Sequence, residues 1–263
     1  MQIKYFGTWA ALNHNADTMH MMISDDTQKL YIDAWGGMSL MQRILRREES
    51  KIEHLRITHC HSDHLLGIAH ILRTHREWHL TIYCSRNITN RIQKIMYLID
   101  QHKLYDRQIS EELVTYVYVD EVSNITIWER HIEPLDLLSD ISEQYGFIMH
   151  YKNKKIVFLG DEAIDILAKN DTNRMIDCDR LLCEALCTEK DAEIKEPHKK
   201  GHSLPSDAAK LGQTLHAKSI IISHIHDYTE NRVQQLEEIK KDVESVYSGK
   251  VYVPHDNETI DLW

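Results

Sequence analysis

The segment from Ile57 to Gly67 constrains this chain more than any other, because it concentrates groups that bind metal ions. It reads Ile-Thr-His-Cys-His-Ser-Asp-His-Leu-Leu-Gly, so three histidines and an aspartate fall within six residues. An apolar strand is predicted before this segment and an amphipathic helix after it. Imidazole nitrogen and carboxylate oxygen are both good zinc ligands. The segment therefore predicts a metal site formed by His59, His61, Asp63 and His64.

The spacing within the motif favours convergence of its side chains. Side chains alternate along an extended chain, so His59 and His61 are expected on the same side. The turn into the following helix would then deliver Asp63 and His64 toward the same point. Two neighbouring pockets that are rich in nitrogen and oxygen suit a two-metal site.

The rest of the chain alternates short β-branched or aromatic runs with amphipathic stretches, which is typical of an α/β protein. Glycine and proline are scarce, with 9 and 4 residues, so no linker is evident and a single domain over residues 1–263 is expected. Strands are predicted near 2–7, 18–23, 29–34, 52–58, 80–84, 114–118, 124–132, 180–184 and 218–223, and a hairpin over 145–159 with its turn at 152–154. Helices are predicted near 38–50, 64–73, 88–102, 205–216 and 231–246.

Charge and cysteine usage narrow the partners and the compartment. The formal net charge is −10 and the basic clusters are small, so a long nucleic acid is disfavoured. The apolar runs are too short to span a bilayer, and no secretory signal is evident at the N-terminus. An odd, irregular set of five cysteines suits reduced thiols, so a cytoplasmic protein without a membrane partner is expected.

These residues carry a family resemblance that covers nearly the whole chain. His-x-His-x-Asp-His resembles the signature of the metallo-β-lactamase superfamily, and Phe6–Thr8 and Ile32–Gly37 are similar to its opening strands and acidic turn. Residues Ile156–Glu162 look like the strand that ends in its metal-bridging aspartate. The C-terminal part, at Gly201–Ser203 and Ile222–His224, is most similar to the ribonuclease Z-like branch, which includes tRNA 3′-processing nucleases and cyclic nucleotide phosphodiesterases. The resemblance implies an αβ/βα four-layer sandwich.

The same resemblance implies a zinc centre with one or two Zn²⁺ ions per chain, with Mn²⁺ as an alternative. Asp161 would bridge the two ions, although the residues alone also allow it to be a helix N-cap. The implied ligands are His59 and His61 for a first ion, and Asp63, His64 and His224 for a second.

Two of these positions also receive catalytic roles from the resemblance. Asp63 would help to orient the nucleophile, and His202 would stabilise developing charge or donate a proton. The alternative for His202 is a surface histidine beside Lys199 and Lys200. Asp33 is expected to orient the metal-binding loop through hydrogen bonds rather than to bind metal itself.

The chain departs from the family pattern at a further expected histidine, where the best-matching position is Leu138. A leucine cannot bind metal, so the first ion would be held weakly or be absent. His131, Asp136 and Asp140 are the candidates that could substitute for the missing imidazole. Replacing Leu138 by histidine should accordingly raise metal occupancy.

A second departure concerns size, because only 13 residues separate Phe147 from Asp161. Ribonuclease Z enzymes of the tRNA-processing type typically insert a long arm there, and this chain has room only for a hairpin. Together with the net charge, this favours a phosphodiesterase acting on a small nucleotide, with a cyclic nucleotide as the best candidate. The alternatives are a tRNA 3′-end endoribonuclease without the arm, a hydrolase of carboxylic esters, lactones or thioesters, and a non-catalytic nucleotide- or protein-binding relative. The resemblance also implies a homodimer.

Overall fold

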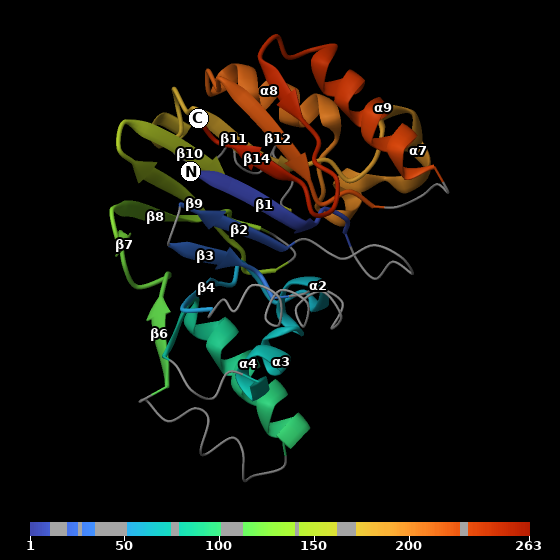
Figure 1. The fold of residues 1–263 in the computed structure, drawn as a ribbon. Coiled ribbons are helices and arrows are strands. Elements are labelled where there is room, and N and C mark those ends of the chain that lie inside the picture. Colours follow the sequence, from blue (N-terminus) through green and yellow to red (C-terminus); the bar gives the residue numbers. More distant parts are fainter. Residues whose placement is uncertain are drawn as a thin grey trace. The chain divides into compact units, whose positions relative to one another are not determined.

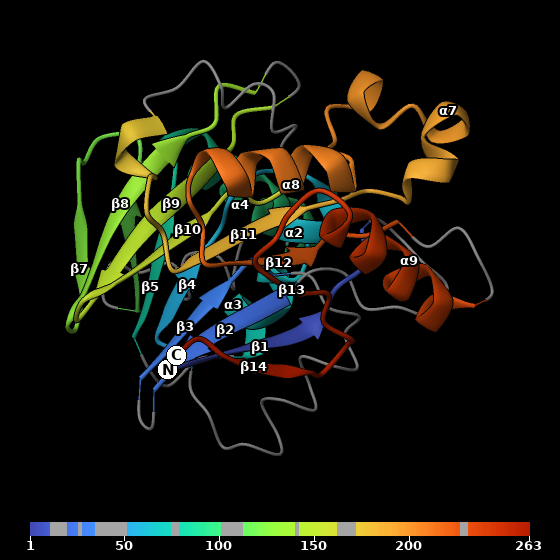
Figure 2. The same cartoon turned by 90° about the horizontal axis from the view of Figure 1, so that it is seen from above.

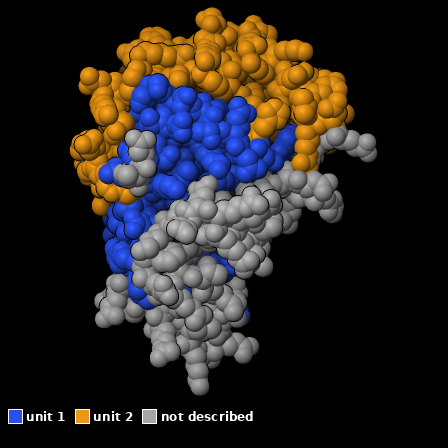
Figure 3. All heavy atoms as spheres, in the orientation of Figure 1, with its two compact units in different colours: residues 1–121, 256–263 blue, residues 122–255 orange. Residues whose placement is uncertain are grey.

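The computed structural model describes residues 1–10, 20–25, 28–34, 52–74, 79–100, 113–139, 142–161, 172–226 and 231–263. The helix predicted at 38–50 lies outside these ranges. The chain divides into two compact units, residues 1–121 with 256–263 and residues 122–255 (Figure 3). Each unit is built on one seven-stranded sheet within the described residues.

Unit 1 contains the sheet with strand order β14-β1-β2-β3-β4-β5-β6 (Figure 1). Pairing is antiparallel from β14 to β3 and parallel from β3 to β6. The strands are β1 (Gln2–Gly7), β2 (His20–Ser24), β3 (Lys29–Ile32), β4 (His54–Arg56), β5 (Leu80–Cys84), β6 (Val114–Tyr118) and β14 (Thr259–Asp261). The helices are α2 (Ser62–Leu65), α3 (Ile68–Thr74) and α4 (Arg86–Asp100).

The core of unit 1 holds these helices against the sheet. Leu55 and Ile82 from the strands share one buried cluster with Ile68, Ile71 and Ile92 from the helices. Full burial of each such side chain is worth about 1.5–3 kcal/mol. This packing fixes where β4 ends and α2 begins, which is the position of the histidine-rich motif.

Unit 2 contains the sheet with strand order β13-β12-β11-β10-β9-β8-β7 (Figure 2). Pairing is antiparallel from β7 to β10 and parallel from β10 to β13. The strands are β7 (Ile125–Ile127), β8 (Arg130–Asp136), β9 (Tyr145–Tyr151), β10 (Lys154–Phe158), β11 (Arg180–Glu184), β12 (Ser219–Ser223) and β13 (Lys250–Tyr252). The helical segments are η1 (Thr172–Arg174), η2 (Glu189–Asp191), α7 (Ala192–Lys195), η3 (Pro197–Lys200), α8 (Pro205–Thr214) and α9 (Arg232–Glu244).

The two sheets share one pairing pattern, with three antiparallel pairings followed by three parallel ones, although the edge strand β14 of unit 1 comes from residues 259–261. In parallel strands the carboxyl ends meet at one edge of the sheet, where ligand-binding loops concentrate. In unit 1 this edge carries Asp33 after β3 and the motif after β4. In unit 2 it carries Asp161 after β10, Glu184 at the end of β11 and His224 after β12.

Most predicted elements are confirmed, and the best predicted are those with a clear period. β5, β6 and β11 have the predicted bounds. β5 and β6 are rich in β-branched and aromatic residues, which favour strands, and β11 is a short aliphatic run. The hairpin of β9 and β10 turns at Lys152 and Asn153, as the sequence predicts. Helix α4 covers Arg86–Asp100, so it begins two residues before the predicted 88–102, whose last two residues lie outside the described ranges.

Two predictions about single elements are wrong. The helix predicted at 64–73 is interrupted, because α2 ends at Leu65 and α3 begins at Ile68. The carbonyl of Gly67, just before α3, accepts the N–H of His70 and of Ile71. The single strand predicted at 124–132 is a hairpin of β7 and β8, in which Ile127 pairs with Arg130. Its two-residue turn puts Trp128 at φ 54°, a conformation usually signalled by Gly or Asn.

Two expectations from composition can also be compared with the structure. No helix in the described ranges is both long and apolar enough to cross a bilayer. The five cysteines, all within those ranges, form no disulfide. Burial raises the pKa of Cys84 to about 12, so this thiol stays protonated at neutral pH.

Candidate metal centre

Unit 1 gathers the imidazoles of the motif at the end of β4. The ring centroids of His59 and His61 are 4.5 Å apart, and those of His59 and His64 are 4.1 Å apart. Asp63 joins them in the first turn of α2, with Oδ2 3.5 Å from Nε2 of His64. His59, Asp63 and His64 are buried, whereas His61 is exposed. The structure therefore brings the four motif residues together.

Asp33 fixes the orientation of this cluster from the end of β3. Its Oδ1 accepts the backbone N–H of Thr58 at 2.8 Å, and its Oδ2 accepts a hydrogen bond from Nδ1 of His64 at 2.8 Å. The hydroxyl of Thr58 donates to Asp33 at 2.9 Å and lies 3.0 Å from Nδ1 of His59. These partners place the protons of both imidazoles on Nδ1. Each Nε2 is then left with the lone pair that a metal ion requires.

The buried charge of Asp33 has a buried positive counterpart. Arg56, at the end of β4, is 1% exposed. Burial lowers the pKa of Arg56 to about 10, and the nearby charge of Asp33 opposes that shift. The guanidinium therefore remains positive at neutral pH and compensates the Asp33 carboxylate, which would otherwise be costly to bury.

Unit 2 gathers a second set of donors at the carboxyl edge of its sheet. Asp161 and His224 follow β10 and β12, and Oδ2 of Asp161 lies 3.5 Å from Nε2 of His224. His202 arrives on the segment after η3, where the N–H of Leu186 bonds to the carbonyl of Ser203. Asp161, His202 and His224 each offer a ligand atom, and these atoms lie within 4.8 Å of one another.

Glu184 is a site residue that the sequence analysis misses. Its Oε2 accepts from Nδ1 of His202 at 2.8 Å and lies 3.4 Å from Nδ1 of His224. Its Oε1 accepts the N–H of Ser203 at 2.9 Å, and its side chain is fully buried. A glutamate inside the apolar run Leu-Leu-Cys-Glu-Ala-Leu-Cys was the available signal, because an ionised residue is rarely buried without partners.

The protonation of His202 reflects this carboxylate. Burial lowers the pKa of His202, but the charge of Glu184 and its hydrogen bond raise it, and the net pKa lies above the ordinary value. His202 and His224 also stack, with ring centroids 5.6 Å apart. Glu184 thus stabilises positive charge on a half-buried imidazole beside a second imidazole.

Several site loops leave their strands through a residue in the left-handed region. The φ values are 62° for Asp33, 69° for Gly160 and 58° for His224. For a residue other than glycine this conformation costs on the order of 1–3 kcal/mol, and such outliers concentrate at functional sites. At Gly160 a Cβ would also lie 3.2 Å from Nε2 of Gln144.

The structure describes three of the positions considered for a further ligand, Leu138, His131 and Asp136. Leu138 is 48% exposed with φ 51°, and its N–H bonds to Oδ1 of Asp136. His131 is exposed on β8, where Nδ1 lies 3.3 Å from the hydroxyl of Thr126. Asp140 lies outside the described residues, as does the segment after Asp161 in which the alternative N-cap role would be tested.

The donors that each unit presents fit zinc. They are imidazole nitrogens and carboxylate oxygens, without a thiolate among the predicted ligands. In each unit a buried carboxylate hydrogen-bonds to Nδ1 of a histidine, the arrangement that fixes the tautomer and orientation of metal-binding imidazoles. The chemistry of each cluster therefore suits a transition metal rather than Mg²⁺ or Ca²⁺, which prefer oxygen.

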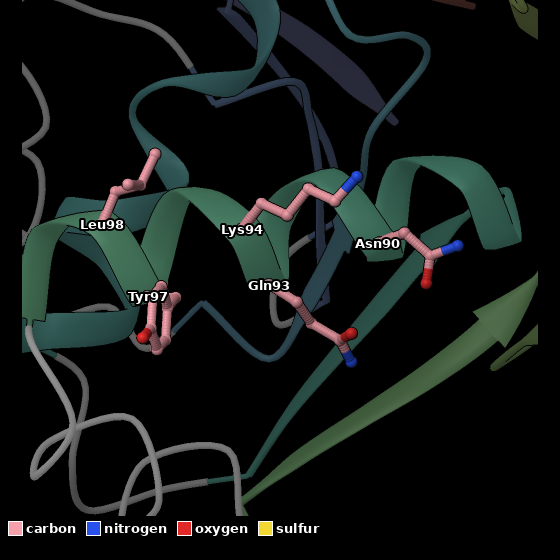
Figure 4. Close-up of a pocket in the computed structure, with 5 residues that line it drawn as sticks. All are labelled: Asn90, Gln93, Lys94, Tyr97 and Leu98. Atoms are coloured by element: carbon pink, nitrogen blue, oxygen red, sulfur yellow. The ribbon is translucent and has the colours of Figure 1, made fainter.

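A separate pocket lies on helix α4. It has a volume of about 510 Å³ and is lined by Asn90, Gln93, Lys94, Tyr97 and Leu98 (Figure 4). None of these five residues is a predicted ligand or catalytic group. The pocket therefore adds nothing to the metal chemistry described above.

Comparison with known proteins places this geometry in a family. Residues 28–225 match the family described as the beta-lactamase superfamily domain, so the chain belongs to the metallo-β-lactamase superfamily of metal-dependent hydrolases. The chain is similar to ribonuclease Z of Streptococcus sanguinis, with 22% identity over 100% of both chains. It is 23% identical to the zinc phosphodiesterase ELAC protein 2 homolog of Caenorhabditis elegans, over 85% of this chain but 32% of that protein. The predicted ribonuclease Z-like resemblance is confirmed.

Solved structures confirm the expected fold. The metallo-β-lactamase fold protein YhfI of Bacillus subtilis gives a TM-score of 0.75 at 14% identity, over 99% of both chains. The short form of human tRNase Z gives 0.73 at 18% identity, over 100% of this chain and 99% of the other. Zinc-bound PqqB of Methylobacterium extorquens gives 0.72 at 14% identity, over 99% and 100%. The α/β sandwich fold predicted from the sequence is thus the fold of this protein.

Proposed function

We propose that this metallo-hydrolase is a zinc-dependent phosphodiesterase that cleaves a small nucleotide, with cyclic nucleotides as the preferred class. The observation that carries the proposal is the position of Glu184, which contacts both His202 and His224. The Glu184 carboxylate therefore contacts both His202, which is proposed to assist the leaving oxygen, and His224, which is proposed to bind metal. A hydrolase of carboxylic esters would not need this second, carboxylate-supported imidazole.

We propose the metal ligands that the sequence implies, within a single domain over residues 1–263. When bound, zinc supplies Lewis-acid stabilisation of developing negative charge and lowers the pKa of water. The proposed ligand set is His59 and His61 for a first ion and Asp63, His64 and His224 for a second, with Asp161 shared. Mn²⁺ would suit the same donors.

The chain's own residues would perform two further tasks. Asp63, 8% exposed beside His64, would accept a hydrogen bond from the attacking water and orient it. His202, held through Nδ1 by Glu184, would present Nε2 to the leaving oxygen and donate a proton to it. Holding Asp63 in the first turn of α2, and His202 by its hydrogen bond to Glu184 at the end of β11, reduces the reorganisation that the reaction requires.

The short connection between β9 and β10 supports a small substrate. These strands pair directly from Tyr151 and Lys154, and the whole stretch from Phe147 to Asp161 forms one hairpin and its exit. This hairpin provides no arm that could hold a folded RNA, and the net charge of −10 disfavours a polyanion. The proposed partners are therefore a small nucleotide and, by resemblance, a second copy of the chain in the cytoplasm.

The proposal predicts hydrolysis of bis(p-nitrophenyl) phosphate and of cyclic nucleotides by the zinc-loaded protein. Asp63→Ala should lower kcat/KM by at least about 100-fold, because it removes the residue proposed to orient the nucleophile. Asp177→Ala, at an exposed aspartate paired with His216, is the matched control and should retain full activity. The proposal fails if no phosphodiester is cleaved faster than by the Asp63→Ala variant.

The same assay distinguishes the other candidate functions. Preference for precursor tRNA over cyclic nucleotides would favour the tRNA 3′-end endoribonuclease, the function in the name of the Streptococcus relative. A non-catalytic relative is favoured by Leu138 and would show an intact fold, nucleotide or protein binding, and no bound metal.

Leu138→His is expected to raise zinc occupancy per chain. The new imidazole would add a nitrogen donor to the loop after β8, and histidine tolerates the left-handed φ of 51° better than leucine does. Metal content after dialysis at limiting free zinc, measured by atomic emission, checks this. Leu98→His, at a leucine that is 75% exposed on α4, is the control and should leave occupancy unchanged. Equal occupancy in both variants would contradict the prediction.

A further inference from the structure

Gln144 contacts the proposed bridging ligand from a separate loop. Its side-chain Nε2 donates to Oδ1 of Asp161 at 3.0 Å, across 17 residues of sequence. Gln144 is 2% exposed, so this amide is almost completely removed from water. Its backbone carbonyl accepts the N–H of Leu137, which ties the loop closed just before β9 begins. The amide is therefore held in place from both its backbone and its side chain.

The hydrogen bond distinguishes the two oxygens of Asp161. Oδ1 is directed to the amide of Gln144, and Oδ2 lies 3.5 Å from Nε2 of His224. Gln144, Asp161 and His224 all belong to unit 2, so both contacts are made within that unit. Gly160 also keeps clear the space beside the amide, since a Cβ there would lie 3.2 Å from Nε2 of Gln144. Gly160 therefore leaves room for the Gln144 amide beside Asp161.

We propose that Gln144 is a positioning residue that sets the rotamer of Asp161 and thereby presents Oδ2 for metal binding. The torsion about the Cβ–Cγ bond of an aspartate has a broad range unless a partner holds one of the carboxylate oxygens. A neutral amide suits this task, because it orients the carboxylate without cancelling the negative charge that attracts the cation. This inference rests on the proposed function, because it requires that Asp161 binds the metal ion.

Gln144→Met tests the inference, because methionine has a similar length but cannot donate a hydrogen bond. Loss of a group that orients a metal ligand typically lowers metal affinity about 10- to 100-fold, and this range is expected here. Zinc affinity is measured by competition with a chromophoric chelator. The visible spectrum of the cobalt-loaded protein should also change, because it reports the geometry of the ligands. The metal-free variant should retain the circular dichroism of the unsubstituted chain.

Gln235→Met is the matched control. Gln235 is also 2% exposed, and its Nε2 donates to the backbone carbonyl of His226 at 2.7 Å rather than to a carboxylate. This control should keep the wild-type zinc affinity and cobalt spectrum. If Gln144→Met fails to fold, Gln144→Asn gives the same test, because it keeps a buried amide but shortens its reach by one methylene.

The outcomes separate this inference from the proposed function. A folded variant at position 144 that binds zinc as tightly as the unsubstituted protein, with an unchanged cobalt spectrum, overturns the role of Gln144 alone. An unsubstituted protein that binds no zinc overturns the metal centre and the role of Gln144 together. Weakened zinc binding in the Gln144 variants but not in Gln235→Met supports the inference.

Discussion

Replacing Asp33 by asparagine is expected to lower zinc affinity about 10- to 100-fold, although asparagine has nearly the same shape. Asp33 accepts hydrogen bonds through both oxygens, from Thr58 on one side and from Nδ1 of His64 on the other. Asparagine can accept through only one of them. If its amide faces His64, the proton must move to Nε2, and the lone pair needed for metal is lost. If its amide faces Thr58 instead, the amide N–H of the asparagine and the backbone N–H of Thr58 point at each other. Two hydrogen-bond donors then meet in a fully buried position.

The measurement is zinc affinity by chelator competition, together with thermal unfolding of the metal-free protein. Asp179→Asn is the matched control, since Asp179 is 7% exposed and accepts from Lys155 N–H and from the side chains of Lys154 and Lys218. Both substitutions should destabilise the fold, because each removes a buried charge from its partners. Only Asp33→Asn should weaken zinc binding. Equal zinc affinity in the two variants would exclude a role for Asp33 in orienting His64.

Glu184→Gln is expected to lower the hydrolysis of cyclic nucleotides by about 100-fold or more, if His202 acts as general acid. Glutamine would turn an amide N–H toward Nδ1 of His202 or toward the N–H of Ser203, which are both donors in the native structure. In the first case the proton of His202 moves to Nε2 of a neutral imidazole. The positive form is no longer stabilised, so less acid is available to the leaving oxygen.

The choice of substrate makes this second prediction specific. p-Nitrophenolate is a stable leaving group and needs little proton assistance, whereas the ribose oxygen of a cyclic nucleotide needs much more. Glu184→Gln should therefore impair cyclic nucleotide hydrolysis far more than hydrolysis of bis(p-nitrophenyl) phosphate. Asp207→Asn, which alters the half-buried partner of the exposed His198, is the control and should affect both substrates little. An equal loss on both substrates would indicate that Glu184 acts on metal binding through His224 instead.

The sequence predicts the elements whose pattern is local. β5 and β11 follow from short runs of β-branched and aliphatic residues, and the histidine motif follows from residues that are neighbours in the chain. Trp128 shows where such reasoning fails. Its left-handed φ of 54° makes a two-residue turn, yet neither tryptophan nor the following glutamate signals one. Tertiary pairing of β7 with β8 determines the turn instead.

The site residues that the sequence does not reveal are those defined by distant partners. Glu184 meets its imidazoles across 18 and 40 residues of sequence, and Gln144 meets Asp161 across 17. No local pattern encodes these contacts. They become visible only when parallel strands bring their carboxyl ends to one edge.

The shared pairing pattern of the two sheets has no counterpart in the sequence as a repeat. β3 and β10 occupy equivalent places, each pairing antiparallel on one side and parallel on the other. Each is followed by a left-handed residue, Asp33 or Gly160, and by a buried carboxylate at or next to it. Topology tolerates wide sequence change, because it depends on the pattern of apolar residues rather than on their identities. Each unit therefore places a carboxylate and histidines at the carboxyl ends of its parallel strands.

Under the proposed function, the motif after β4 and the residues after β10 and β12 all bind zinc. Anomalous diffraction at the zinc absorption edge, from crystals of the zinc-loaded protein, tests this proposal directly. We expect anomalous density bonded to His64, Asp161 and His224. Density at His64 alone, or at none of these side chains, would contradict the proposal.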